Sequence, residues 1–171
     1  MSTIAARLSA LGYVLPVPEA AAGTRRFRTV RILGSRALIS GHGPQNPDGS
    51  VATPLGKVGR DLTVEEGCLA ARLTGLSMLG SLEQALGNLD RITEWGRVFG
   101  MVNSAPGFNQ QPAVMNGFSD LILDVFGPEV GAHSRSAVGM AELPYDIPVE
   151  IEAEVIFSNE EGARHWVVTR A

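Results

Sequence analysis

The strongest constraint on the fold is an alternation of apolar and acidic residues near the end of the chain. Apolar side chains occupy every second position from Val149 to Phe157, and Glu150, Glu152 and Glu154 lie between them. Because successive side chains of a β-strand point to opposite faces of a sheet, this segment predicts a strand with one buried face. The rest of the chain must supply further strands and a cover for that face.

Two segments with helical spacing can supply the cover. Thr63 and Glu66 match a capping box, in which each side chain satisfies a backbone N–H, and a long apolar stripe follows them. A second helix is expected to begin near Pro112, a residue that suits a first helical turn. It should run to about Phe126 and end at Gly127.

The other segments predict strands and one short helix. A helix is expected near 3–11 and strands at 27–33, 36–41 and 91–102, and the runs on either side of the turn at 143–146 should form a hairpin. The order α, β, β, α, β, α, β, β predicts an α+β domain with both main helices on one face of the sheet. The opposite face is then left for other subunits or for water.

Length and composition indicate one soluble domain. The chain has 171 residues, of which 44% are hydrophobic, and we expect a domain at 23–157, a helical arm and connector at 1–22, and a tail at 158–171. No stretch approaches the roughly 18 uninterrupted apolar residues of a membrane helix. The start lacks a cationic region followed by an apolar one, and Cys68 is the single cysteine, so we expect a cytoplasmic protein.

Several kinds of chemistry are disfavoured. The net charge of −4 and the isoelectric point of about 5.4 argue against nucleic-acid binding. The three histidines and Cys68 lack short metal-ligand spacing, so no metal is expected. Ser40 lies in no G-x-S-x-G elbow, and the following G-H-G-P-Q-N is not a dinucleotide fingerprint, so we expect neither a serine hydrolase nor a dinucleotide-binding protein.

Arg135 is the leading candidate for a binding residue. It lies among small residues on a strand-like run, and the next run carries carboxylates, including Glu150 and Glu152. A guanidinium can pair with a carboxylate through two parallel hydrogen bonds, so this pattern predicts a pocket for a small carboxylic acid. The residues alone leave two alternatives open: Arg135 forms an ion pair across a subunit interface, and Glu150 belongs to a solvated strand face.

Three sequence strings resemble the YjgF-like reactive-intermediate deaminase (Rid) family, also labelled endoribonuclease L-PSP. They are S-G-H-G-P-Q-N-P-D-G-S at 40–50, H-S-R-S-A-V-G-M-A-E-L-P at 133–144 and V-E-I-E-A at 149–153. The resemblance covers roughly 23–157, and the N-terminal arm is typical of a longer subgroup. It implies a chorismate-mutase-like fold with a mixed sheet of about five to six strands, assembled as a homotrimer.

The resemblance also implies an activity. Family members hydrolyse small enamine or imine acids to 2-oxo acids and ammonia at subunit-interface clefts, without metal or cofactor. The carboxylate-binding arginine then corresponds to Arg135 and the water-positioning glutamate to Glu150. The strand-end serine, its following glycine and the helix asparagine correspond to Ser40, Gly41 and Asn116.

Two positions depart from the family pattern. The pocket tyrosine corresponds to Phe27, which has no hydroxyl, and a common cysteine corresponds to Ala137. Both changes make the expected pocket more apolar. A non-catalytic trimer that binds a small carboxylate metabolite is therefore the alternative function, whereas ribonuclease activity rests only on the family label and conflicts with the acidic charge.

Overall fold

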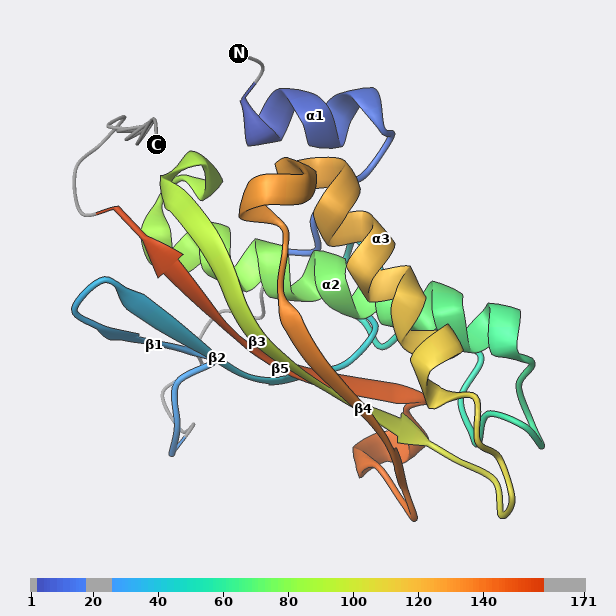
Figure 1. Ribbon diagram of the computed structural model, residues 1–171. Coiled ribbons are helices and arrows are strands. Elements are labelled where there is room, and N and C mark those ends of the chain that lie inside the picture. Colours follow the sequence, from blue (N-terminus) through green and yellow to red (C-terminus); the bar gives the residue numbers. More distant parts are fainter. Residues whose placement is uncertain (1–2, 18–25, 159–171) are drawn as a thin grey trace, which may run out of the picture.

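The computed structural model describes residues 3–17 and 26–158, which form a five-stranded mixed sheet with two long helices on one face (Figure 1). The strands are β1 (Val30–Leu33), β2 (Arg36–His42), β3 (Ile92–Asn103), β4 (Ser134–Met140) and β5 (Val149–Phe157). The helices are α1 (Ile4–Ala10), α2 (Val64–Leu86) and α3 (Gln111–Val130), with the 3-10 turns η1 (Leu89–Arg91) and η2 (Pro144–Asp146). The predicted α+β class is confirmed, with α2 and α3 as the two main helices.

The strand order shows that the predicted hairpin of the last two strands is wrong. The order is β1-β2-β5-β3-β4, so β3 lies between β4 and β5. β4 pairs with β3 in parallel, and β5 pairs antiparallel with both β2 and β3. The physical reason is that α3 carries the chain back across the sheet between β3 and β4, which makes them a parallel pair.

The predicted capping box begins α2. The Thr63 backbone N–H donates to Glu66 Oε2 at 2.8 Å, and the Glu66 N–H donates to Thr63 Oγ1 at 3.2 Å. The helix ends at Gly87, whose φ of 77° is left-handed and therefore suits glycine. The local sequence thus sets both ends of the helix that crosses the centre of the molecule.

Gly117 allows α3 to approach α2 closely. A Cβ at this position would lie 2.8 Å from the Cys68 carbonyl carbon and closer still to its oxygen. Ordinary carbon contacts begin at about 3.5 Å, so only glycine fits at this crossing point. The close contact fixes the height of α3 above the sheet, and with it the position of the residues that α3 presents to β4.

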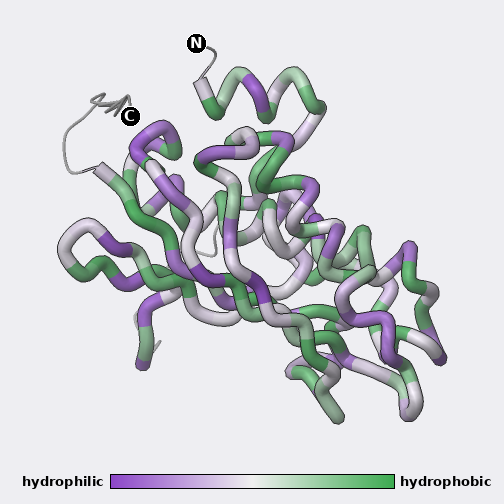
Figure 2. The backbone as a smooth tube through the Cα atoms, in the orientation of Figure 1, coloured by the Kyte–Doolittle hydropathy of each residue, from purple (hydrophilic) through white to green (hydrophobic). Residues whose placement is uncertain are grey.

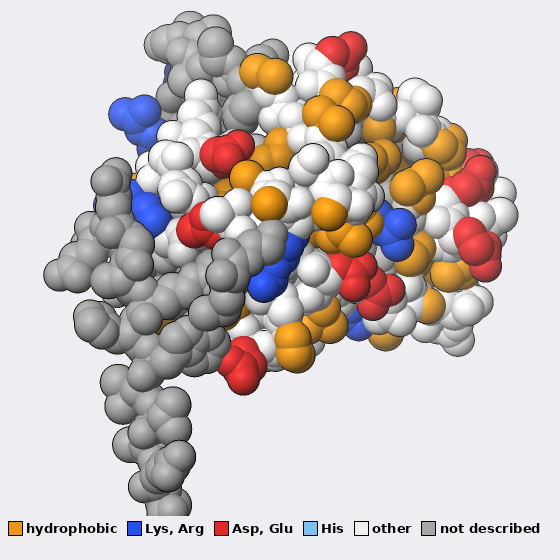
Figure 3. Space-filling view, turned by 90° about the horizontal axis from the view of Figure 1, so that it is seen from above, with side chains coloured by type: hydrophobic (Ala, Val, Ile, Leu, Met, Phe, Trp, Pro, Cys, Tyr) orange, Lys and Arg blue, Asp and Glu red, His pale blue; other side chains and the backbone are white. Residues whose placement is uncertain are grey.

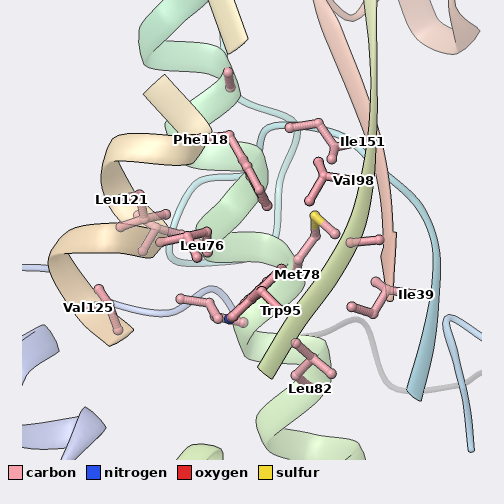
Figure 4. Packing of buried hydrophobic residues seen from close by; sticks show 14 of the residues in the cluster. Ile39, Leu76, Met78, Leu82, Trp95, Val98, Phe118, Leu121, Val125 and Ile151 are labelled. Atoms are coloured by element: carbon pink, nitrogen blue, oxygen red, sulfur yellow. The ribbon is translucent and has the colours of Figure 1, made fainter. Parts of the chain in front are cut away.

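The main core lies between the two long helices and the sheet. Trp95 packs edge to face against Phe118, with ring centroids 5.7 Å apart, and against Phe126 at 5.6 Å. Other core side chains shown in Figure 4 come from both helices and from three strands: Leu76, Met78, Leu82, Leu121, Val125, Val98, Ile39 and Ile151. Burial alternates along β5, as its sequence pattern predicts, and both hydrophobic and hydrophilic segments occur in the sheet (Figure 2).

The predicted N-terminal helix is α1, which packs on the end of α3. Ile4 donates its backbone N–H to Asp90 Oδ1 at 2.8 Å, and Arg7 Nη1 donates to the Val125 carbonyl at 3.0 Å. α3 is interrupted at Gly127, whose φ of 81° and ψ of 171° are not helical, in agreement with its predicted role as a terminator. The expected tail lies outside the described residues from position 159 onward.

The face of the sheet opposite the long helices carries a second apolar cluster. Its buried members are Met101, Leu143 and Ile147. Partly buried residues pack against them, namely Phe99, Val138 and Met140. On the side where α1 lies, by contrast, apolar and charged side chains are interspersed (Figure 3). No helix in the described ranges is long and apolar enough to cross a bilayer.

Candidate functional site

Arg135 lies on β4, beside Val98 of β3, and its side chain reaches α3. Nη1 donates to Ser119 Oγ at 2.8 Å, and Nη2 donates to Asn116 Oδ1 at 3.1 Å and to the Pro112 carbonyl at 3.2 Å. The three acceptors are four and three residues apart, so they form one stripe along the helix. The structure therefore brings together the expected arginine and the expected helix asparagine.

No carboxylate compensates the charge of Arg135 within residues 3–17 and 26–158. The ion pairs in these ranges join Arg36 to Glu154, Lys57 to Glu142, and Arg60 to Asp61. The oxygens that accept from Arg135 belong to a hydroxyl, an amide and a peptide carbonyl, all of which are neutral. The guanidinium is thus held in place without being neutralised, which is what an anion-binding residue requires.

Glu150 lies on the other face of the sheet from Arg135. It alternates on β5 with Val149 and Ile151, which point into the main core, so its own side chain lies on the open face. β4 and β5 are two strand spacings apart, and the offset between the residues is three positions, which separates their Cα atoms by about 14 Å. The expectation of an arginine directly beside a carboxylate on the next strand is wrong within one protomer.

Ser40, Gly41 and Glu150 form a separate group. β2 has a register shift between Ile39 and His42, where it pairs with β5. A Cβ on Gly41 would lie 2.9 Å from the Glu150 carboxyl carbon, so the carboxylate packs directly against Gly41 and would have to move if a larger residue stood there. Burial raises the pKa of Glu150 above its ordinary 4.5, and the nearby charge of Glu152 raises it further.

Ser40 makes the local hydrogen bond that a strand-end hydroxyl commonly makes. Its Oγ donates to the Arg28 carbonyl at 2.8 Å. Phe27 precedes Arg28 in the chain and is 61% exposed. Ala137 lies two residues after Arg135 on the same face of β4 and packs partly against the main core.

The predicted site residues thus fall into two groups at different places on the sheet. We call Arg135, Asn116 and Ala137 the β4 half-site. We call Ser40, Gly41, Glu150 and the preceding Phe27 the β5 half-site. β3 separates the two half-sites in the sheet, so one protomer does not bring them together.

Sequence reasoning missed Ser119, which makes the shortest hydrogen bond to Arg135. Ser119 Oγ also lies 2.9 Å from His133 Nε2, and His133 Nδ1 lies 2.7 Å from the Gly131 carbonyl. The available signal was the three-residue spacing from Asn116, which places Ser119 on the same side of α3. The structure places His133 one hydrogen bond away from the Arg135 contact.

One surface groove lies apart from both half-sites. Its volume is about 660 Å³, and it is lined by 59–64, before and at the start of α2, and by 106–110, before α3. The exposed ion pair of Arg60 and Asp61 lies in it. None of the predicted site residues lines this groove. Within the described ranges, no cluster of three or more His, Cys, Asp or Glu residues is arranged to hold a metal ion.

Comparison with known proteins establishes the family. The family model described as YjgF/chorismate mutase-like, putative endoribonuclease matches residues 5–149. The chain therefore belongs to this family, and the resemblance drawn from its motifs is confirmed.

Individual relatives cover nearly the whole chain. Protein TCP17 of Trypanosoma cruzi is 43% identical over 156 residues, which is 91% of this chain and 95% of TCP17. The solved structure of Atu1372 from Agrobacterium tumefaciens, a protein of unknown function, is 38% identical with a TM-score of 0.82 and covers 91% of this chain and 92% of that one. A putative endoribonuclease from Shewanella oneidensis is 33% identical with a TM-score of 0.82, covering 91% of this chain and 100% of that one.

Proposed function

We propose that this protein binds small carboxylic acids through Arg135 and hydrolyses enamine or imine acids to 2-oxo acids and ammonia. The observation that carries the proposal is the state of Arg135, which is fixed by three neutral acceptors on α3 and has no carboxylate partner in the described ranges. A positioned but uncompensated guanidinium favours an anionic ligand. A planar carboxylate matches its donor geometry.

The chemistry needs little beyond positioning. Water adds to the imine carbon and forms the C–O bond, and the C–N bond then breaks as ammonia leaves with the proton from the new hydroxyl. Arg135 holds the acid group, and Glu150 orients the water, takes its proton during addition and passes that proton to the imine nitrogen. An enamine acid first shifts a proton from nitrogen to its terminal carbon and so becomes the imine. The raised pKa of Glu150 suits this role because a more basic carboxylate accepts a proton more readily near neutral pH.

Both half-sites can serve one substrate only if they come from different copies of the chain. We therefore propose a homotrimer in which the β4 half-site of one protomer meets the β5 half-site of the next. Phe99, Val138 and Met140 on the open sheet face are only partly buried within the protomer, and they support such an assembly because apolar residues on an open sheet face are commonly covered by another subunit.

The first test measures turnover of freshly generated 2-iminobutanoate by following 2-oxobutanoate and ammonia. We expect the wild type to exceed the background rate and Arg135→Lys to lower kcat/KM on the order of 100-fold, because lysine keeps the charge but loses the fork. Arg7→Lys is the matched control, because the Arg7 side chain donates to the Val125 carbonyl near the end of α3 and not to the α3 residues that Arg135 contacts. A wild type with no rate above background would exclude the hydrolase.

A wild type that shows no turnover but still binds acids would favour the alternative function, which is a non-catalytic trimer that binds a small carboxylate metabolite. Phe27 and Ala137 supply neither the hydroxyl nor the thiol expected at their positions, which favours a protein that binds a carboxylate metabolite without turning it over. Titration with 2-oxobutanoate separates the two functions, because a binding protein still shows saturable binding that Arg135→Lys weakens.

Ribonuclease activity is a weaker candidate, carried by the printed names of the family and of the Shewanella relative. The net charge of −4 opposes the electrostatic attraction that RNA binding requires. Cleavage of RNA by the wild type that disappears in Arg135→Ala would support this activity instead.

The shared site has a specific test by complementation. Arg135→Lys and Glu150→Gln proteins are each expected to lose most of the activity, but co-refolding them in equal amounts should restore activity in about one quarter of the sites, because each active site takes one intact residue from each copy. A mixture as inactive as its components would contradict the shared site.

The proposed trimer has its own test. The mass in solution should be three times the 18.1 kDa of one chain. Val138→Glu on the open face should lower this mass, whereas Leu123→Glu on α3 should not.

A further inference from the structure

The hydrogen bonds that end on Arg135 have a direction that the structure determines. The Gly131 carbonyl can only accept, so the His133 nitrogen facing it at 2.7 Å, Nδ1, carries the hydrogen. In a neutral imidazole the other nitrogen, Nε2, is then an acceptor, and the Ser119 hydroxyl donates to it at 2.9 Å. Ser119 Oγ in turn accepts from Arg135 Nη1. The chain therefore runs from Arg135 through Ser119 and His133 to the backbone.

This direction favours a positioning role over a nucleophilic one. The N–H of the positively charged Arg135 occupies one of the two lone pairs of Ser119 Oγ and withdraws electron density from it, which makes this oxygen a poorer nucleophile. The acceptor behind His133 is a neutral carbonyl rather than a carboxylate, so it stabilises an imidazolium less than an aspartate does. The arrangement instead holds the guanidinium of Arg135 in one orientation.

The two terminal nitrogens of Arg135 are held differently. Nη1 is anchored at 2.8 Å to the partly buried Ser119, whereas Nη2 makes longer contacts, at 3.1 and 3.2 Å, to neutral oxygens of the exposed residues Asn116 and Pro112. A carboxylate oxygen makes stronger, charge-assisted hydrogen bonds than an amide or peptide carbonyl. An incoming acid can therefore replace the Nη2 contacts while the Nη1 anchor remains.

We propose that Ser119 and His133 are positioning residues for acid binding: His133 orients the Ser119 hydroxyl, and that hydroxyl anchors Arg135 with its Nη2 side open to a small carboxylate. This inference rests on the proposed function for the role of Arg135. His133 is itself placed by the core, since its ring packs edge to face against Phe118 with centroids 5.8 Å apart. Phe118 is fully buried, so the chain ties the guanidinium to the rigid interior.

The test is a double-mutant cycle on the binding of 2-oxobutanoate, the product of the proposed reaction, measured by isothermal titration calorimetry. Ser119→Ala should weaken binding about tenfold, which corresponds to about 1.4 kcal/mol. His133→Ala should weaken it by a smaller factor. The double variant should bind no more weakly than Ser119→Ala alone, because His133 acts only through the Ser119 hydroxyl.

Two controls separate positioning from folding. Ser119→Thr keeps the hydroxyl and should keep most of the affinity, and Ser77→Ala removes a helix serine whose hydroxyl bonds only to the Leu73 carbonyl. Wild-type affinity in Ser119→Ala, or losses that add in the double variant, would overturn the inference. Absence of turnover with the binding cycle intact would remove the proposed hydrolysis and leave the positioning role standing, whereas a wild type that binds no acid would remove both.

Discussion

The crossing of α2 and α3 at Gly117 provides a sharp test of the packing that holds the β4 half-site. In Gly117→Ala the new methyl group would lie 2.8 Å from the Cys68 carbonyl carbon, about 0.7 Å inside ordinary contact, and even closer to the oxygen. Overpacking costs about 1 to 3 kcal/mol, and the upper end applies because backbone cannot rotate away. Alanine returns about 1 kcal/mol of helix propensity, so the net loss is about 2 kcal/mol.

For a chain of this length that loss lowers Tm by about 4 to 8 °C, which thermal unfolding followed by circular dichroism can measure. The matched control is Gly67→Ala on α2, where the new methyl would meet side-chain methyls of Val114 and Val58 at 3.2 Å and these can yield. We expect the control to change Tm by less than half as much. A Gly117→Ala protein as stable as the wild type would refute the claim that backbone contact sets the helix spacing.

The other predictions concern charges near the sheet. Burial raises the pKa of Glu150. Its contribution to stability is therefore fully present below its ordinary pKa of 4.5 and is lost as pH rises through the folded-state pKa. Glu150→Gln should consequently melt higher than the wild type at pH 7 but not at pH 4. Hydrogen bonds from Arg36 lower the pKa of Glu154, so its contribution is present at neutral pH and is lost as pH falls, and Glu154→Gln should melt lower at pH 7. Thermal melts of both variants across this pH range check the opposite signs, and equal signs would contradict them. Lys57 Nζ donates to Oδ1 of the fully buried Asn103 at 2.8 Å and also to the Ala141 carbonyl and Glu142. Lys57→Met should therefore cost about 1 to 3 kcal/mol in urea unfolding, and no change would show that these hydrogen bonds together add nothing to stability.

Elements with strong local signals could be predicted from the sequence. The capping box of Thr63 and Glu66 defined the start of α2, and Gly127 marked the break in α3. The alternation from Val149 to Phe157 correctly separated the buried and open faces of β5. In each case the determining interaction lies within a few residues, so the sequence pattern carries it completely.

The pairing of the strands could not be predicted in the same way, because alternation specifies the two faces of a strand and not its neighbours in the sheet. The Pro-rich turn at 143–146 favoured a hairpin, but the helix between β3 and β4 makes those two strands a parallel pair and sends β5 to the far side of β3. The strand–helix–strand order was the usable signal. Ser119 was missed for a related reason, since its importance depends on β4 lying beneath α3.

The same crossover explains why the candidate site is divided. With β4 beside β3 at the end of the strand order, the Arg135 side chain lies against α3 on the helix face, whereas Glu150 faces the other side of the sheet. No side-chain rotation closes a gap of about 14 Å through the sheet between them. A strand at the end of a sheet also leaves backbone groups unpaired, and these invite a neighbouring chain. The separation that argues against catalysis by one protomer is thus the feature that favours a site completed by a second copy.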